Sequence, residues 1–390
     1  MKRGLLFLMM LVLCVACFSD IGISSSNQEY QETWREYRIT FDDSDQLAPA
    51  IWADKIVYMD ERNGNLDIYL FNLSSGKEEP LVTEPHHQSY PDIYEDKVVY
   101  ADMRNGNSDI YLYNLSTGIE TAICTNPATQ WRPHVYGDRV IWIDNRSGRW
   151  DVYMYDLSTE KEKRISNGSS YNPPFVDIFD EIIVWDDDRN YEPNEIWREI
   201  YMYNLDEERE IRVTDNSHKM EGQGWPAVYD DIIVWARGSA NQKSGYDLVI
   251  YRISTKEKRV ITSLGIHYFP DIYKNKVVWD NCTEDNVGDI YMYDLSVNES
   301  IPICRRPGTQ ADPKIYGNKV VWEDYRNGNW DVYLYTNESV NVPTQNQNKQ
   351  NCQGIAQLLR EYHYILIAIV VSIAVIIPFI YYKLKTKRMN

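Results

Sequence analysis

The chain has 390 residues, with 58 acidic side chains against 40 basic ones and a formal net charge of −18 at pH 7. This acidic balance disfavours a nucleic-acid partner, because like charges repel. Beyond the N-terminal region, the four cysteines Cys124, Cys282, Cys304 and Cys352 include no C-x-x-C spacing, which disfavours a zinc site of that type.

The N-terminus begins with Lys2 and Arg3 and continues with an apolar run from Leu5 to Phe18. A basic start followed by a short apolar stretch is the pattern of a secretory signal. We therefore predict a signal peptide in residues 1–20.

One motif then recurs seven times between Pro49 and Tyr335. Its second copy reads PDIYEDKVVYADMRNGNSDIYLYNLSTG. The acidic residue that opens the IYLY segment recurs every 42 to 48 residues, as Asp67, Asp109, Asp151, Glu199, Asp247, Asp289 and Asp331. A repeat of this length that is rich in short strands is typical of propeller blades and not of helical solenoids.

Each copy predicts four short strands, separated by turn sequences such as Gly-Asp and N-L-S-T-G. Before the first copy, Tyr37–Thr40 looks like a fourth strand, and the last copy ends without one. We therefore predict an all-β fold, a seven-bladed β-propeller of four-stranded blades over residues 37–336 that the N-terminal strand closes.

The repeat unit resembles TolB-type propeller repeats, particularly the form found in archaeal cell-surface proteins. The resemblance covers residues 37–336, although copies four to six lack the R-N-G-N loop. Because this family includes binding, scaffolding and enzymatic members, the resemblance implies a fold and leaves the function open.

After the repeats, residues 337–362 predict a polar stalk that leads to a membrane anchor. Residues 364–382 hold no charge and are long enough to cross a bilayer as one helix. The tail, residues 383–390, is basic and is expected to be cytoplasmic. The sequence thus predicts one C-terminal transmembrane helix, with the propeller outside the cell membrane.

If the propeller lies outside the cell membrane, glycosylation and a disulfide bond are expected. Seven N-x-S/T sequons are candidate glycan acceptors: Asn72, Asn114, Asn145, Asn167, Asn281, Asn298 and Asn337. Cys282 and Cys304 fall within one repeat, so they are the candidate disulfide pair.

Four loops pair two carboxylates around R-N-G-N or R-S-G-R, as in Asp60 with Asp67 and Asp102 with Asp109. Such loops have some likeness to calcium loops. An arginine stands where an oxygen ligand is needed, as Arg62 and Arg104 do. We therefore expect hairpin turns in which arginine pairs with the flanking aspartates, and we predict no metal site.

The candidate ligand site is a polar collar at the mouth of the central channel. Three residues before the proline of the first strand, six copies carry Gln or His: Gln46, Gln88, Gln130, Gln223, His267 and Gln310. Trp131 and Trp225 accompany them. The collar is expected to bind a glycan or peptide; in the alternative interpretation these side chains satisfy backbone groups where the chain turns inward.

We expect a non-catalytic binding or scaffolding module at the cell surface, with no catalytic residues and no cofactor, whose partners are other envelope proteins or glycans. One alternative is a metal-dependent polysaccharide lyase. Histidines near the first strands would serve it: His86, His87, His134 and His267. The other alternative is a structural component of the surface layer.

Overall fold

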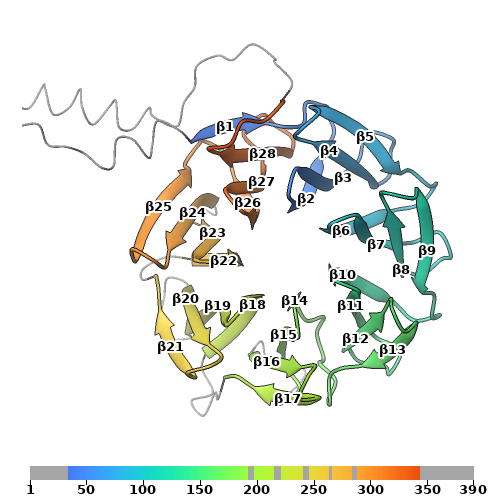
Figure 1. Cartoon of the computed structure of the whole chain (residues 1–390), viewed down its shortest axis with the longest axis vertical. Coiled ribbons are helices and arrows are strands. Elements are labelled where there is room, and N and C mark those ends of the chain that lie inside the picture. The colour runs from blue at the N-terminus through green and yellow to red at the C-terminus, as the bar shows by residue number, and fades with distance from the viewer. Residues whose placement is uncertain are drawn as a thin grey trace, which may run out of the picture. The chain divides into compact units, whose positions relative to one another are not determined.

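The structure is a computed structural model that describes residues 34–191, 197–214, 221–239, 246–262, 266–282 and 288–342. The secondary-structure elements of this described part are all β-strands. Figure 1 shows the sheets arranged around a common centre, with the first strand of each repeat innermost.

The first strands surround the central channel. They are β2 (Gln46–Trp52), β6 (Gln88–Tyr94), β10 (Gln130–Tyr136), β14 (Val176–Phe179), β18 (Glu221–Tyr229), β22 (Ile266–Tyr273) and β26 (Gln310–Tyr316). A two-residue turn joins each to its second strand. The first turn residue has positive φ in every repeat, as the turn sequences predict, for example Ala53 at 52° and Gly137 at 60°.

The second and third strands form the core of each repeat. The second strands are β3 (Lys55–Asp60), β7 (Lys97–Asp102), β11 (Arg139–Asp144), β15 (Ile182–Asp187), β19 (Ile232–Ser239), β23 (Lys276–Cys282) and β27 (Lys319–Asp324). The third strands are β4 (Asp67–Asn72), β8 (Asp109–Asn114), β12 (Asp151–Asp156), β16 (Glu199–Asn204), β20 (Tyr246–Arg252), β24 (Gly288–Asp294) and β28 (Asp331–Thr336). Their side chains are mostly buried on both faces, because each sheet lies between two others.

The fourth strands lie on the outside and are mostly exposed. They are β5 (Lys77–Val82), β9 (Ile119–Cys124), β13 (Lys161–Arg164), β17 (Arg209–Arg212), β21 (Glu257–Val260) and β25 (Glu299–Cys304). The last repeat has no fourth strand of its own; β1 (Arg35–Arg38) lies beside β28 instead. The predicted closure by the N-terminal strand is therefore confirmed, with the strand two residues earlier than expected.

The prediction of seven separate four-stranded blades is wrong. The described residues form five four-stranded sheets and one eight-stranded sheet, which holds the fifth and sixth repeats. One parallel pair, Tyr246 of β20 opposite Ile266 of β22, joins those two repeats. Both strands begin one residue before the position that the repeat pattern predicts. This extension brings neighbouring edges into hydrogen-bonding range, which the repeat period cannot reveal.

The predicted signal peptide (1–20), transmembrane helix (364–382) and basic tail (383–390) lie outside the described residues. Within the described part, no helix is long and apolar enough to cross a membrane. Only the start of the predicted stalk is described, and there Asn341 N donates a hydrogen bond to Leu73 O at 2.8 Å. This segment thus runs along the first sheet before the described part ends.

Candidate functional site

A β-bulge interrupts the first strand in six repeats, near the end where the chain enters the strand. In β10, for example, the register shifts between Trp131 and His134. The residue before the proline takes a left-handed conformation there, with φ between 46° and 53°, in Ala48, Tyr90, Arg132, Trp225, Phe269 and Asp312. Proline is tolerated at a bulge because no ladder hydrogen bond needs its missing N–H. Bulges re-aim side chains, and they are over-represented beside functional sites.

The bulges gather aromatic side chains at one end of the channel. The Trp225 ring lies 5.0 Å from Tyr268, 5.6 Å from Phe269 and 6.0 Å from Phe175, measured between centroids. In the second and third repeats, the rings of Tyr90 and Trp131 meet edge to face, with their centroids 5.1 Å apart. We call this set the aromatic mouth: Tyr90, Trp131, Phe175, Trp225, Tyr268 and Phe269.

Arg132 lies within the aromatic mouth. Its guanidinium carbon is 3.8 Å from the centroid of Phe175 and 4.6 Å from that of Trp131. Its Nη1 donates to Pro174 O at 3.4 Å, and its buried Nε has no hydrogen-bond partner among the described residues. Burial lowers the pKa of Arg132. A desolvated cation on aromatic faces is a suitable partner for an anionic group.

Carboxylates line the channel beyond the bulges, and three of them have a shared structural role. Asp92 and Asp271 lie two residues after the left-handed residue of the bulge, and Asp177 occupies the equivalent position in the fourth repeat, whose first strand has no bulge. Each accepts a hydrogen bond from the next repeat's first strand, at Val135 N (2.9 Å), Val228 N (2.8 Å) and Ile315 N (2.7 Å). These contacts satisfy backbone donors on the open edge of the first strands.

Other channel carboxylates come from the second strands. Asp186 accepts from Trp225 N at 3.1 Å and from Arg198 at 2.6 Å. Asp280 accepts from Tyr268 N at 3.1 Å, and Glu323 from Ala48 N at 3.0 Å. Burial, reinforced by the nearby negative charge of Asp312, raises the pKa of Asp280 and of Glu323 to about 7. Both are therefore only partly ionised near neutral pH.

Two basic side chains, His134 and Lys314, lie among these carboxyl groups. His134 Nδ1 lies 3.5 Å from Asp92 and 4.0 Å from Asp177. Burial alone would lower the pKa of His134, but the hydrogen bond and the charge of Asp92 raise it. Lys314 donates to Asp312. Burial raises the pKa of Asp271 to about 7 even though Lys314 opposes that rise.

A ring of aromatic side chains encloses the opposite end of the channel. Each first strand ends in one of them: Trp52, Tyr94, Tyr136, Phe179, Tyr229, Tyr273 and Tyr316. Neighbouring centroids are 4.2 to 4.9 Å apart around the whole circle, including the contact of Trp52 with Tyr316 at 4.6 Å. We call this set the aromatic collar. Because each ring contacts both neighbours, the collar ties the first strands together.

The structure places the predicted glutamine collar away from the channel mouth. Gln46, Gln88, Gln130 and Gln310 are completely buried. Each donates from its amide to a loop carbonyl, as Gln130 does to Ala128 O at 2.8 Å. Gln223 is also buried and accepts from Trp235 Nε1 at 2.6 Å. These contacts are those of the alternative interpretation, in which the side chains satisfy nearby polar groups.

Of the remaining predicted site residues, Trp131 and Trp225 both belong to the aromatic mouth. The four histidines, in contrast, do not come together in one place. His86 and His87 are exposed on a loop, and His134 lies in the channel. His267 is buried, which lowers its pKa to about 4. Within the described ranges, no three His, Cys, Asp or Glu side chains are placed to hold a metal ion.

The predicted disulfide between Cys282 and Cys304 is not formed. Cys282 pairs with Gly288 on one side of β24, and Cys304 pairs with Ile290 on the other. Two strand spacings, about 9.5 Å, separate such positions, more than a disulfide spans.

The acidic loops are arginine-tied turns, as predicted. Arg104 bonds Asp102 at 2.6 Å, and the equivalent pairs recur at Arg62, Arg146 and Arg326. Among the sequons, Asn167, Asn298 and Asn337 are exposed, and glycosylation stays a prediction.

No family model and no curated protein matches the sequence. Solved structures do match. The β-propeller domain of the trilobed protease from Pyrococcus furiosus is 14% identical, with a TM-score of 0.60 over 77% of this chain and 95% of that chain. An oligogalacturonate lyase from Vibrio parahaemolyticus is 15% identical, with a TM-score of 0.58 over 77% and 93%. TolB from Acinetobacter baumannii is 17% identical, with a TM-score of 0.50 over 71% and 67%.

The chain has a TolB-type β-propeller fold. At these identities the likeness shows the fold alone, and the three neighbours include a lyase, a protease domain and TolB. The resemblance to archaeal surface proteins has no support among them. The protease propeller is described as having an open velcro topology, whereas here β1 lies beside β28.

Proposed function

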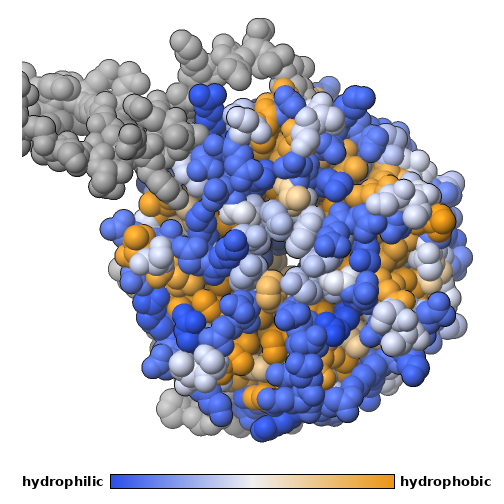
Figure 2. Space-filling model, in the orientation of Figure 1, coloured by the Kyte–Doolittle hydropathy of each residue, from blue (hydrophilic) through white to orange (hydrophobic). Residues whose placement is uncertain are grey.

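We propose that the chain is a non-catalytic binding module, held outside the cell by its C-terminal segment, that binds an acidic glycan at the aromatic mouth. The observation that carries the proposal is Arg132 stacked on Phe175 and Trp131. Aromatic faces suit the apolar faces of sugar rings, and a guanidinium pairs with carboxylates. Figure 2 shows one face of the ring as mainly hydrophilic, with residues of intermediate hydropathy around its centre.

The choice of an acidic sugar draws on a neighbour. The lyase with this fold is named for oligogalacturonate, a chain of sugars that carry carboxylates. Arg132 is the cation in the aromatic mouth that such a carboxylate would meet. A glycan of this kind, or an envelope protein that bears it, is therefore the partner we propose.

The test is calorimetric titration of oligogalacturonate into the purified full chain. We expect saturable binding that Arg132→Gln and Trp225→Ala weaken at least about tenfold, a loss of roughly 1.4 kcal/mol. Arg259→Gln, an exposed change on the outermost strand, is the control and is expected to leave the affinity unchanged. Equal binding by all variants would contradict this location of the site, and unfolding midpoints would show whether each variant is folded.

A lyase is the second candidate, because burial raises the pKa of Asp271, Asp280 and Glu323 to about 7, so that a fraction of each is protonated at neutral pH. Carboxyl groups with such pKa values are suited to general acid catalysis. The same titration samples separate the two functions, since a lyase releases a sugar with a new double bond that absorbs in the ultraviolet. Product release that Asp280→Asn abolishes would replace the binding proposal by the enzymatic one.

The proposed location outside the cell rests only on the uncharged residues 364–382 and the basic residues 383–390. We expect the full chain to sediment with membranes and a chain truncated after residue 342 to be released. Protease added to intact cells should then remove the repeats from the full chain. Protection of the repeats from that protease would place them inside the cell.

A further inference from the structure

The face that carries the hairpin turns differs in charge between repeats. The second turn residue is acidic in the first five repeats: Asp54, Asp96, Asp138, Glu181 and Asp231. In the last two repeats it is an amide, Asn275 and Asn318. These turns follow the aromatic collar, at the end of the first strands opposite the bulges. The amides therefore change the charge of one sector of this face.

Three of the acidic turn residues have basic partners in the preceding repeat around the ring. Lys97 lies 3.5 Å from Asp138, and Arg139 lies 2.7 Å from Glu181. Lys319 of the last repeat reaches Asp54 of the first, at 3.5 Å. A basic residue at the start of each of these second strands thus meets a carboxylate on the next turn.

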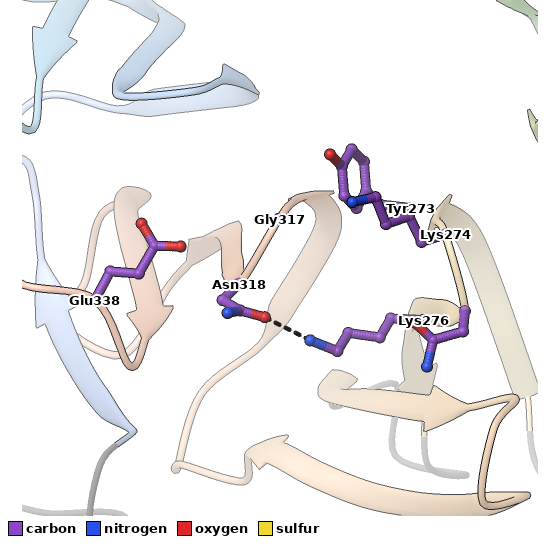
Figure 3. Close-up of a pocket in the computed structure, with 7 residues that line it drawn as sticks. Tyr273, Lys274, Lys276, Gly317, Asn318 and Glu338 are labelled. Carbon is purple, nitrogen blue, oxygen red and sulfur yellow. Dashed lines mark hydrogen bonds between the residues drawn. The ribbon is translucent and has the colours of Figure 1, made fainter.

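Lys276 occupies the same position in the sixth repeat but meets an amide. Its Nζ donates to Asn318 Oδ1 at 2.6 Å, as Figure 3 shows. Asn318 stands where Asp138, Glu181 and Asp54 stand in their repeats. The lysine contact is therefore present in this repeat too, but its partner is a neutral amide instead of a carboxylate.

A pocket of about 180 Å³ lies at this contact. Its lining includes Lys274, Lys276, Asn318 and Glu338. Glu338 accepts a hydrogen bond from Lys319, which also lies 3.5 Å from Asp54. Burial lowers the pKa of Lys276, the charges of Asp294 and Glu338 oppose that effect, and the charge of Lys274 acts with burial. Two lysine side chains, with Glu338 beside them, therefore line a small space.

We propose that this pocket binds a tetrahedral oxyanion, a sulfate or phosphate group, between Lys274 and Lys276. Lysine acts on such groups as a point charge, whereas planar carboxylates favour the arginine fork. The volume is below that of pockets that enclose whole drug-sized ligands, roughly 300 Å³ or more. The pocket thus suits the anionic group of a larger ligand, and it is separate from the aromatic mouth.

The test is titration of sodium sulfate and sodium phosphate into the full chain at constant ionic strength. We expect saturation by one equivalent of anion. Asn318→Asp restores the lysine–carboxylate pair of the other repeats, so it should fold normally and weaken anion binding at least about tenfold. Lys276→Gln should have the same effect. Lys97→Gln, the same change in the second repeat, is the control and should leave binding intact.

Several results would overturn the proposal. They are the absence of saturation by either anion at millimolar concentration, equal binding by Asn318→Asp, or loss of binding in Lys97→Gln. A preference for sulfate would identify a sulfated glycan as the source of the group, and a preference for phosphate a phosphorylated one. Because Arg132→Gln leaves this pocket intact, failure of glycan binding at the aromatic mouth does not affect this test.

Discussion

Arg38 donates from Nη2 to Asp331 Oδ1 at 2.8 Å, and this pair joins the first described strand to the last. The next residue, Ile39, is 1% exposed and packs with Val332 and Leu334 of β28. Its N–H donates to Val332 O at 2.8 Å. The N-terminal strand therefore contributes both hydrogen bonds and apolar burial to the last sheet.

We expect Ile39→Ala to lower the free energy of unfolding by about 2–4 kcal/mol, because a buried isoleucine leaves a cavity. Urea denaturation monitored by tryptophan fluorescence gives the value. Ile119→Ala is the matched control: Ile119 is 60% exposed on β9, so the change should stay within about 0.5 kcal/mol. If both variants unfold alike, the N-terminal strand does not stabilise the ring.

The aromatic collar gives a second prediction. Phe179 lies 4.7 Å from Tyr136 and 4.3 Å from Tyr229, between ring centroids. Each such pair contributes about 0.5–1.5 kcal/mol beyond burial. Phe179→Ala should therefore destabilise the chain by roughly 2–4 kcal/mol in urea.

Phe179→Tyr is the control for the collar, because tyrosine occupies the equivalent place in five other repeats. We expect this variant to unfold at nearly the urea concentration of the unaltered chain. A loss as large as that of the alanine variant would mean that the position requires phenylalanine and that ring contact is not what matters.

The arginine-tied loops give a third prediction. Arg104 donates to Asp102 and to Glu120 at 2.6 Å each, and it stacks on Tyr111 at 4.3 Å. Lysine cannot reproduce this fork, so Arg104→Lys should destabilise by about 1–3 kcal/mol. Arg305→Lys is the comparison, since Arg305 is 50% exposed with one contact at 3.4 Å. Equal thermal midpoints for the two variants would contradict a structural role for the fork.

Much of the fold could be predicted from the repeat. The strand order within each copy and the closing strand follow from alternating residues and from the unmatched strands at the two ends. The joined fifth and sixth repeats could not be predicted, because a single pair at Tyr246 and Ile266 makes the connection. Nothing in the residue types of a strand end records a one-residue extension.

The residues of the proposed site could be predicted in part. Trp131 and Trp225 were identified, whereas Arg132 was not, because the bulge that re-aims it depends on backbone conformation. Phe175 was also missed, although it occupies the position equivalent to Arg132 in the next repeat. The glutamines were misplaced because a polar residue near a channel can equally well turn inward to a loop carbonyl, as Gln88 does to His86 O at 2.6 Å.

The channel carboxyls give a prediction on pH. Burial, with Asp312 nearby, raises the pKa of Asp280 to about 7 from an ordinary value of 3.8. Between these values the folded chain binds more protons than the unfolded chain, so this group's contribution to stability falls as pH rises from 4 to 7. Asp280→Asn keeps an acceptor for Tyr268 N and removes the charge. We therefore expect it to raise the free energy of unfolding at pH 8 by at least about 1 kcal/mol.

The measurement is urea denaturation of both chains at pH 5 and at pH 8. The gain from Asp280→Asn should be large at pH 8 and much smaller at pH 5, where the native carboxyl is protonated. Asp96→Asn is the control, because a hydrogen bond from Ser116 lowers the pKa of this partly exposed carboxyl and it stays ionised at both pH values. An Asp280→Asn effect of the same size at both pH values would show that Asp280 does not titrate in this range.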